Sequence, residues 1–176
     1  MNNKFHSYTK KYLSKLESCF DEELINGMAK LTNDLRKAWK EKKSIFICGN
    51  GGSGSNANHI ANDLLYGVGF NRETGKYSLG MRVESLVSNS GVITCLANDI
   101  NYEDIFSKQI EIKGNEEDLL ITLSGSGNSA NIIKALNKAN SLGLNTTAIV
   151  GFDGGECKKI ARNVIHTSIN DMEISE

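Results

Sequence analysis

The chain carries Ser44-Ile45-Phe46-Ile47-Cys48-Gly49-Asn50-Gly51-Gly52-Ser53, a short apolar run that ends in a glycine-rich loop. Such a run predicts a strand that is buried on both faces, as the strands of a parallel sheet are. Four further strands are predicted at residues 81–86, 118–123, 145–150 and 163–167, with helices between them at residues 53–67, 91–97, 103–112 and 130–142. Because strands and helices alternate, we expect an α/β protein with a doubly wound, five-stranded parallel sheet.

The N-terminal part of the chain is predicted to be helical. Apolar residues recur at helical spacing from Phe5 to Phe20 and again from Leu24 to Trp39, which predicts two amphipathic helices. We interpret residues 1–42 as a helical hairpin whose apolar stripes serve either the core of this chain or a contact between subunits. Residues 43–176 are expected to form the α/β core, so that residues 1–176 make one domain.

The C-terminal residues predict the beginning of one more helix. Asn170 and Asp171 are residue types that cap helix N-termini, and residues 172–176 would form the first turn. The sequence ends at Glu176, so we expect that the helix that would close the domain is missing.

Composition argues against several classes of partner. The formal net charge is −1 and the basic residues are dispersed, which disfavours binding to nucleic acid. Neither a stretch of about 18 apolar residues nor an apolar signal segment is present, so we expect no membrane span and a cytoplasmic location. Four cysteines without C-x-x-C pairing are predicted to be buried reduced thiols, namely Cys19, Cys48, Cys95 and Cys157.

A second strand-end loop, Ser124-Gly125-Ser126-Gly127-Asn128-Ser129, has the same glycine and serine character as the loop at residues 49–53. Glycine lets the backbone approach an anion, serine hydroxyls donate to its oxygens, and a helix N-terminus adds about half a positive charge. Ligands of parallel sheets bind at the carboxyl ends of the strands, where both loops fall. The loops are therefore predicted to hold a phosphorylated small molecule by its phosphate.

Two other interpretations of the loops are open. Residues 49–54 also read G-x-G-x-x-G, but a dinucleotide site needs an acidic residue about 20 residues further on, and Glu84 lies later than that. Both loops could instead be tight turns that bind nothing. The second loop has no role in a dinucleotide site, and phosphate binding is favoured.

Two aspartates, Asp63 and Asp99, are candidates for catalytic or substrate-binding roles. His59 and Asp63 lie four residues apart on a predicted helix and face the same side. They could be a surface pair, a general base with its partner, or two metal ligands. Asn98 and Asp99 lie in a cluster of capping residues that includes Asn101, the predicted N-cap of the next helix, and we interpret Asp99 as a contact for substrate hydroxyls.

Two further features are interpreted as structural. His166 ends an apolar strand and is predicted to stabilise the fold rather than to react. Asp153-Gly154-Gly155 follows another strand and is predicted to be a turn.

Five segments stand in the order and at the spacing of one family: Gly49-Asn50-Gly51-Gly52-Ser53, His59-Ile60-Ala61-Asn62-Asp63-Leu64, Leu96-Ala97-Asn98-Asp99-Ile100-Asn101-Tyr102-Glu103-Asp104-Ile105-Phe106, Ser124-Gly125-Ser126-Gly127-Asn128-Ser129 and Asp153-Gly154-Gly155. With these segments the chain resembles the sugar isomerase (SIS) domain family, in the branch of the phosphoheptose isomerases, from about Leu24 to its end. This branch converts sedoheptulose 7-phosphate to a heptose 7-phosphate. The resemblance implies a flavodoxin-like sheet and a homotetramer with its sites at subunit interfaces.

The resemblance also implies roles for individual residues, with a phosphorylated sugar as the substrate. It assigns substrate contacts to Asn50, Gly51, Gly52 and Glu176, phosphate binding to Ser53, Ser124, Gly125, Ser126 and Ser129, and sugar contacts to Asn98 and Asp99. It implies no organic cofactor, and it implies one zinc ion per subunit, held by His59, Asp63 and Glu176.

The chemistry that the resemblance implies is the exchange of a ketose and an aldose through an enediol, in which one group takes a proton from carbon. Asp63 stands where the family has a glutamate as this base, and Glu176 stands where the family has a glutamine. The opposing histidine of the family would lie beyond Glu176.

Our leading hypothesis is a phosphosugar isomerase that acts on sedoheptulose 7-phosphate or on another ketose phosphate. Asp63 is one methylene shorter than the glutamate of the family, and a shift of about 1 Å can lower a rate about a hundredfold. The alternative is therefore a non-catalytic SIS-type protein that binds a sugar phosphate or has a regulatory or scaffold role.

Overall fold

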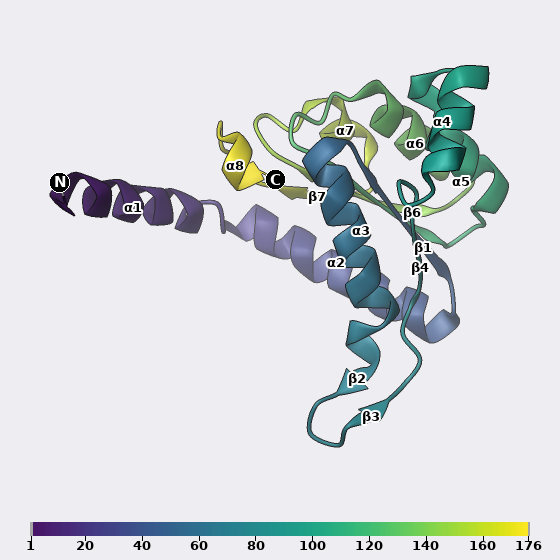
Figure 1. The fold of residues 1–176 in the computed structure, drawn as a ribbon, viewed down its shortest axis with the longest axis horizontal. Coiled ribbons are helices and arrows are strands. Elements are labelled where there is room, and N and C mark those ends of the chain that lie inside the picture. Colours follow the sequence, from purple (N-terminus) through teal and green to yellow (C-terminus); the bar gives the residue numbers. More distant parts are fainter. Residues whose placement is uncertain (1, 176) are drawn as a thin grey trace.

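A five-stranded sheet lies at the centre of the computed structural model, which describes residues 2–175 (Figure 1). The strands, in their order across the sheet, are β4 (Arg82–Ser85), β1 (Ser44–Gly49), β5 (Leu119–Ser124), β6 (Asn145–Val150) and β7 (Asn163–His166). All neighbours are parallel, so the predicted five-stranded parallel sheet is confirmed. Since β1 pairs with β5, the two glycine and serine loops that follow these strands lie side by side.

Helices cover both faces of the sheet. The α-helices of the described residues are α1 (Asn2–Glu17), α2 (Glu22–Glu41), α3 (Gly51–Leu65), α4 (Ser90–Asp99), α5 (Ser107–Lys113), α6 (Ala130–Ser141), α7 (Gly155–Ile160) and α8 (Met172–Ser175), and α1 alone projects away from the sheet. Alternate side chains of β1 point to opposite faces. Ile45 and Ile47 pack with α2 and α3, whereas Phe46 and Cys48 pack with α5, α6 and α7, which gives two buried apolar layers. Within residues 2–175, no helix has the length and apolar character needed to cross a membrane.

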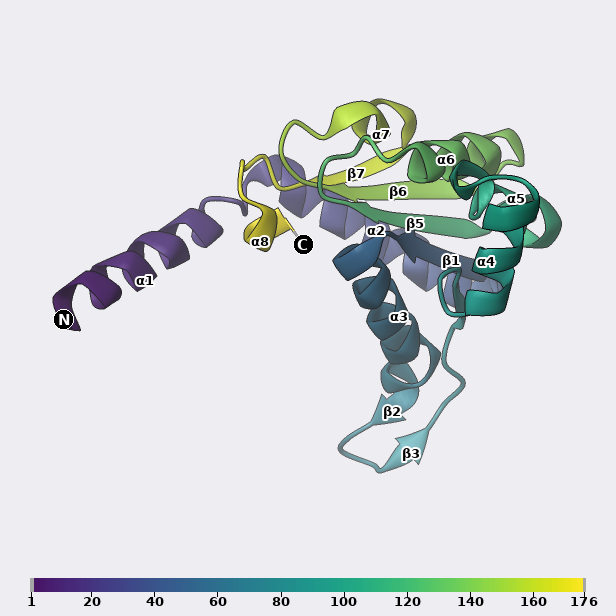
Figure 2. The ribbon, with the colours of Figure 1, turned by 45° about the horizontal axis from the view of Figure 1, so that its top comes forward.

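The two N-terminal helices are present, but the prediction that they form a hairpin is wrong. Figures 1 and 2 show α1 extending away from the body of the molecule, joined end to end with α2. The α2 helix begins at an N-cap, Asp21, whose side chain accepts a hydrogen bond from the backbone N–H of Leu24 at 2.8 Å. The buried face of α2 lies on the sheet, and α1 does not pack against the rest of α2. Phe5 and Tyr8 of α1 are 74% and 67% exposed.

A small hairpin projects from the body between α3 and β4, and the sequence did not predict it (Figure 2). Its strands are β2 (Phe70–Asn71) and β3 (Lys76–Tyr77), preceded by a 3-10 turn, η1 (Gly67–Gly69). Strands of two residues are too short to show a periodicity. The Tyr66 hydroxyl donates to that of Tyr77 at 2.6 Å, which ties the two ends of the hairpin together.

Three short elements refine the other predictions. The region 103–112, predicted as one helix, is divided into a 3-10 turn, η2 (Tyr102–Asp104), and α5. The side chain of Asn101 accepts from the backbone N–H of Asp104 at 3.0 Å, which confirms Asn101 as an N-cap. The predicted turn at residues 153–155 leads into α7, and α8 begins at Met172 as predicted. Glu176 lies outside the described residues.

The prediction that all four cysteines are buried is wrong for one of them. Cys19, Cys48 and Cys157 are buried, whereas Cys95 is exposed because none of the residues 90–99 of α4 is buried. Burial raises the pKa of the Cys157 thiol to about 11 and raises the pKa of Cys48 further. The buried thiols are therefore unreactive, and the described cysteines are all free.

Asp118 connects the first residue of β1 to the turn before β5, and removal of its side chain is predicted to destabilise the sheet. Its carboxylate is buried and accepts from the backbone N–H groups of Ser44 at 2.8 Å and Asn115 at 2.9 Å. Asp118→Ala leaves these donors without their acceptor and should lower the free energy of unfolding by about 1–3 kcal/mol, measured by urea denaturation. The neighbouring Glu117 forms only surface ion pairs, with Lys37 and Lys43.

Glu117→Ala is the matched control for this experiment and should change the free energy of unfolding by less than about 1 kcal/mol. Equal effects of the two substitutions would contradict a structural role of the Asp118 carboxylate.

Candidate functional site

The two strand-end loops converge on one pocket. This pocket has a volume of about 180 Å³ and is lined by Asn50, Ser53, Leu123, Ser124, Gly125, Ser126, Ser129 and Met172. Six of these residues are among those that sequence reasoning assigned to phosphate or substrate binding. The structure thus brings together two segments that are more than 70 residues apart in the chain, because β1 and β5 are neighbours.

Glycine is required in the second loop by a close approach of two backbone segments. Gly127 has a φ of +66°, and a Cβ atom at this position would lie 2.0 Å from the carbonyl oxygen of Gly154. Internal hydrogen bonds hold the rest of the loop, because the Ser124 hydroxyl accepts from the Gly127 N–H and the Ser126 hydroxyl accepts from the Asn128 N–H, both at 3.2 Å. The loop is therefore shaped before any ligand binds.

The polar character of this pocket comes from backbone N–H groups and side-chain hydroxyls. The N-cap residues of α3 and α6, Asn50 and Ser129, make no side-chain hydrogen bond to the first turn of their helices, which leaves the first N–H groups available to a ligand. Among the lining residues that the structure describes, none carries a charge. Such a pocket suits a phosphate group held by N–H and O–H donors at two helix N-termini.

A second pocket adjoins the first at Asn50. It has a volume of about 280 Å³ and lies beneath α4, between the N-terminal half of α3 and η2. Tyr102 lines it and donates a hydrogen bond from its hydroxyl to Oδ1 of Asn50 at 3.1 Å. Asn131, buried near the start of α6, exchanges two hydrogen bonds of 2.9 Å with the Asn50 side chain. Sequence reasoning gave roles at the site to neither residue, because nothing in one sequence pairs positions so far apart.

The predicted sugar contacts are not part of either pocket. Asn98 and Asp99 lie at the exposed end of α4, where Asn98 Nδ2 donates to Asp99 Oδ1 at 2.8 Å and the thiol of Cys95 donates to Oδ2 at 3.3 Å. The hydrogen bond from Asn98 and, to a smaller extent, that from Cys95 hold the pKa of Asp99 below its usual value. The carboxylate of Asp99 therefore stays ionised and can accept from ligand hydroxyls.

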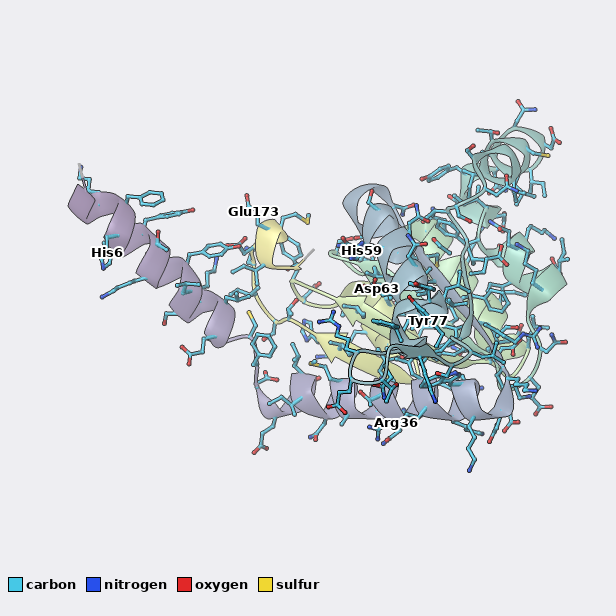
Figure 3. All side chains as sticks on the ribbon, turned by 60° about the horizontal axis from the view of Figure 1, so that its bottom comes forward. His6, Arg36, His59, Asp63, Tyr77 and Glu173 are labelled. Atoms are coloured by element: carbon cyan, nitrogen blue, oxygen red, sulfur yellow. The ribbon has the colours of Figure 1, made fainter. Side chains whose placement is uncertain are left out.

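The predicted catalytic pair is assembled on α3 but also lies outside both pockets. His59 Nε2 and Asp63 Oδ2 are 3.5 Å apart, as expected for residues one helical turn apart (Figure 3). Their side chains are 78% and 68% exposed, so the pair alone adds little to stability. Neither residue lines the pocket formed by the loops. Within this one chain, the phosphate pocket and the pair are separate features.

The described residues supply only part of a metal site. A catalytic zinc ion has three protein ligands in addition to water. His59 and Asp63 offer one nitrogen and one carboxylate, and Glu176 lies outside the described residues. In residues 2–175, no group of three or more His, Cys, Asp or Glu side chains could hold a metal ion. Any zinc ion here would need ligands from beyond these residues.

His166 has the structural role that the sequence predicts. It is 7% exposed at the end of β7, where Nε2 donates to the carbonyl oxygen of Phe152 at 3.0 Å. Since Nε2 carries the hydrogen, Nδ1 accepts from the ammonium group of Lys158, also at 3.0 Å. The ring thus holds the chain that follows β6.

Comparison with known proteins identifies relatives across most of the chain. A family model described as SIS domain matches residues 7–151. A phosphoheptose isomerase of Helicobacter pylori (strain P12) is 39% identical over 143 residues, which cover 80% of this chain and 70% of that protein. Another from Helicobacter pylori (strain HPAG1) is 42% identical over 120 residues, which cover 66% of this chain and 58% of that protein.

Solved structures show the same fold. A phosphoheptose isomerase from Francisella tularensis superposes with a TM-score of 0.85 at 23% identity and covers 98% of this chain and 88% of its own. The phosphoheptose isomerase from Neisseria gonorrhoeae gives a TM-score of 0.83 at 22% identity, with the same coverage.

The close approach at Gly127 predicts that this glycine cannot be replaced. We expect inorganic phosphate to raise the melting temperature of the unaltered protein, and Gly127→Ala should disrupt the second loop, lower the stability and abolish this rise. Gly75 is a matched control because it has a similar φ of +63° and no atom within 4 Å of an added Cβ. Gly75→Ala should cost only the strain of the left-handed backbone, about 1–2 kcal/mol, and leave the response to phosphate unchanged. A Gly127→Ala protein that still responds to phosphate like the Gly75→Ala protein would refute this account of the loop.

Proposed function

We propose that this chain, which belongs to the SIS domain family and to its phosphoheptose isomerase branch, converts sedoheptulose 7-phosphate to heptose 7-phosphate. The observation that carries the proposal is the single pocket formed by the two glycine and serine loops, to which the resemblance to the family assigns phosphate binding. The relatives at 39% and 42% identity are phosphoheptose isomerases, which supports a substrate of this class.

The phosphate group is proposed to bind between the two loops. Ser53, Ser124, Ser126 and Ser129 would donate from their hydroxyls, while Gly51, Gly52 and Gly125 would let the backbone come close. Because the lining is uncharged, the N–H groups at the starts of α3 and α6 provide the attraction for the dianion. This arrangement fixes one end of the sugar and leaves the carbonyl end free to reach other groups.

Asp63 is proposed to be the base of the reaction. Conversion of the ketose to the aldose removes a proton from C1 and delivers a proton to C2, while the hydroxyl proton moves from O1 to O2. A carboxylate can carry the proton between the two carbons, and His59, 3.5 Å from Asp63, can orient it. Asn98 and Asp99 would hold the hydroxyls of the sugar chain.

We propose that the site is completed by other subunits of a homotetramer. The groups given to the sugar and to the proton transfer are exposed and lie outside the phosphate pocket of their own chain. Exposed apolar side chains run along α1 and the start of α2, including Phe5, Tyr8 and Met28. Apolar surface of this kind is usual at contacts between subunits. A second subunit seated there could bring an Asp63 to a neighbouring phosphate pocket.

A zinc ion is proposed as a cofactor, one per subunit, with His59, Asp63 and Glu176 as its ligands. When bound, it would polarise the carbonyl oxygen of the sugar. No organic cofactor is needed for this proton transfer. The buried, free thiols of Cys19, Cys48 and Cys157 suit a reducing compartment, and we propose a cytoplasmic location.

The direct test is turnover. The protein, incubated with sedoheptulose 7-phosphate with and without added zinc, should yield heptose 7-phosphate, separated from the isomeric substrate by anion-exchange chromatography. An H. pylori phosphoheptose isomerase is the positive control. Absence of product when the control is active would contradict the proposal.

Substitution at Asp63 tests its role as the base. Asp63→Asn keeps the size of the side chain and removes its basicity, so kcat should fall at least about 100-fold while KM changes little. Asp63→Glu restores the residue of the family and should keep or raise kcat. Glu73→Gln, on the projecting hairpin, is a charge-matched control that should leave both constants unchanged. A similar loss for Asp63→Asn and Glu73→Gln would exclude Asp63 as the base.

A second candidate is a non-catalytic protein that binds sugar phosphates, or that has a regulatory or scaffold role. It is favoured by the position of His59 and Asp63 outside the phosphate pocket and by the short Asp63 side chain. Thermal stabilisation by sedoheptulose 7-phosphate in a sample that gives no product would support this alternative.

A further inference from the structure

The side chain of Asn50 is held by two residues that have no place in the proposed reaction. Its Nδ2 donates to Oδ1 of Asn131, and its Oδ1 accepts from Nδ2 of Asn131, each at 2.9 Å. The hydroxyl of Tyr102 donates to the same Oδ1 at 3.1 Å. Asn131 is 3% exposed, so its amide is removed from water and depends on this pairing.

These contacts use most of the hydrogen-bonding capacity of Asn50. A carboxamide oxygen accepts two hydrogen bonds, and that of Asn50 already accepts from Asn131 and Tyr102. The amide nitrogen donates two hydrogen bonds, and that of Asn50 already donates one to Asn131. The side chain of Asn50 therefore has a single N–H left for a ligand. Its main contact with a substrate comes from the backbone of the loop, and its side chain serves to hold that loop.

The three residues join three segments of the site. Asn50 follows the β1 strand in the first loop and is the N-cap of α3, and Asn131 follows the second loop on α6. Tyr102 begins η2, shortly after α4, which carries Asn98 and Asp99. The amide pair fixes the distance between the two phosphate loops. The Tyr102 hydrogen bond fixes the end of α4 against the first loop, and it is the longer and more exposed of the contacts.

We propose that Asn131 and Tyr102 are positioning residues that act through Asn50: Asn131 sets the spacing of the two phosphate loops, and Tyr102 sets the place of the sugar-binding end of α4 relative to the phosphate. The proposal rests on the proposed function, since it gives the residues their role toward a phosphorylated sugar. It separates two tasks, because phosphate alone needs only the loops, whereas the sugar needs α4 as well.

Two ligands distinguish these tasks in calorimetry, inorganic phosphate and sedoheptulose 7-phosphate. Tyr102→Phe should leave the Kd of inorganic phosphate within twofold and weaken sedoheptulose 7-phosphate at least fivefold, with a matching fall in kcat/KM. Asn131→Ala should weaken both ligands about tenfold. Asn137→Ala, on the exposed side of α6, and Tyr77→Phe, which removes a hydroxyl contact on the hairpin, are the controls and should change neither.

The double variant tests whether Tyr102 acts through Asn50. In an Asn50→Ala background, Tyr102→Phe should have no further effect on sedoheptulose 7-phosphate, within twofold. A fivefold loss that persists there means that Tyr102 touches the substrate itself and overturns the proposal. Equal weakening of both ligands by Tyr102→Phe, or no weakening of either, also overturns it. Tyr102→Phe removes one exposed hydroxyl, so it keeps the test valid if Asn131→Ala fails to fold.

The turnover assay tests the proposed function, and the binding measurements test the positioning role separately. A protein that binds sedoheptulose 7-phosphate without turnover is not an isomerase, yet the Kd values of the two ligands still decide the roles of Tyr102 and Asn131. Turnover with both Kd values unchanged in the variants would leave the isomerase in place and refute the positioning role.

Discussion

The parallel pairing of β1 with β5 is the constraint on which the site depends. It brings Gly49 level with Leu123, so the chain leaves both strands at the same edge of the sheet and enters α3 and α6 side by side. The two helices then begin beside one pocket, which their N-cap residues Asn50 and Ser129 line. The buried carboxylate of Asp118 contributes to this register from the opposite edge, where it bonds the backbone at the start of β1.

Among the residues that the structure describes, the lining of this pocket carries no charged side chain, which has a consequence for the proposed function. Backbone N–H groups and serine hydroxyls would bind a phosphate group through a fixed geometry. Asn50, Asn131 and Tyr102 then connect this geometry to α4, an element with no buried residue of its own. The pocket is held by internal hydrogen bonds and the segments given to the sugar are exposed, which is the arrangement expected where a neighbouring subunit completes the site.

Much of the fold could be predicted from the sequence because it follows from local pattern. The apolar runs such as residues 44–48 and the glycine loops have signatures that do not depend on the rest of the chain. The course of α1 could not be predicted, because an apolar stripe such as Phe5 and Tyr8 does not say which surface will cover it. The exposure of Cys95 has the same cause, since the apolar pattern of α4 is not matched by burial in this chain.

The meeting of the two loops in one pocket was predicted, and the residues that hold the loops together were not. Ser53 and Ser124 stand in motifs with a local meaning, whereas the bond between Asn50 and Asn131 joins residues 81 positions apart. The assignments of Asp63, His59, Asn98 and Asp99 to the reaction remain predictions. They concern side chains that do not line the pocket of their own chain, and one sequence does not describe which other groups meet them.

The measurement that tests the central claim most directly is a crystal structure of the protein with sedoheptulose 7-phosphate bound. The account predicts one phosphate group between the loops at residues 49–53 and 124–129, with its oxygens within about 3.2 Å of backbone N–H groups and serine hydroxyls of both. A phosphate group bound by only one of these loops, or bound elsewhere on the molecule, would contradict it.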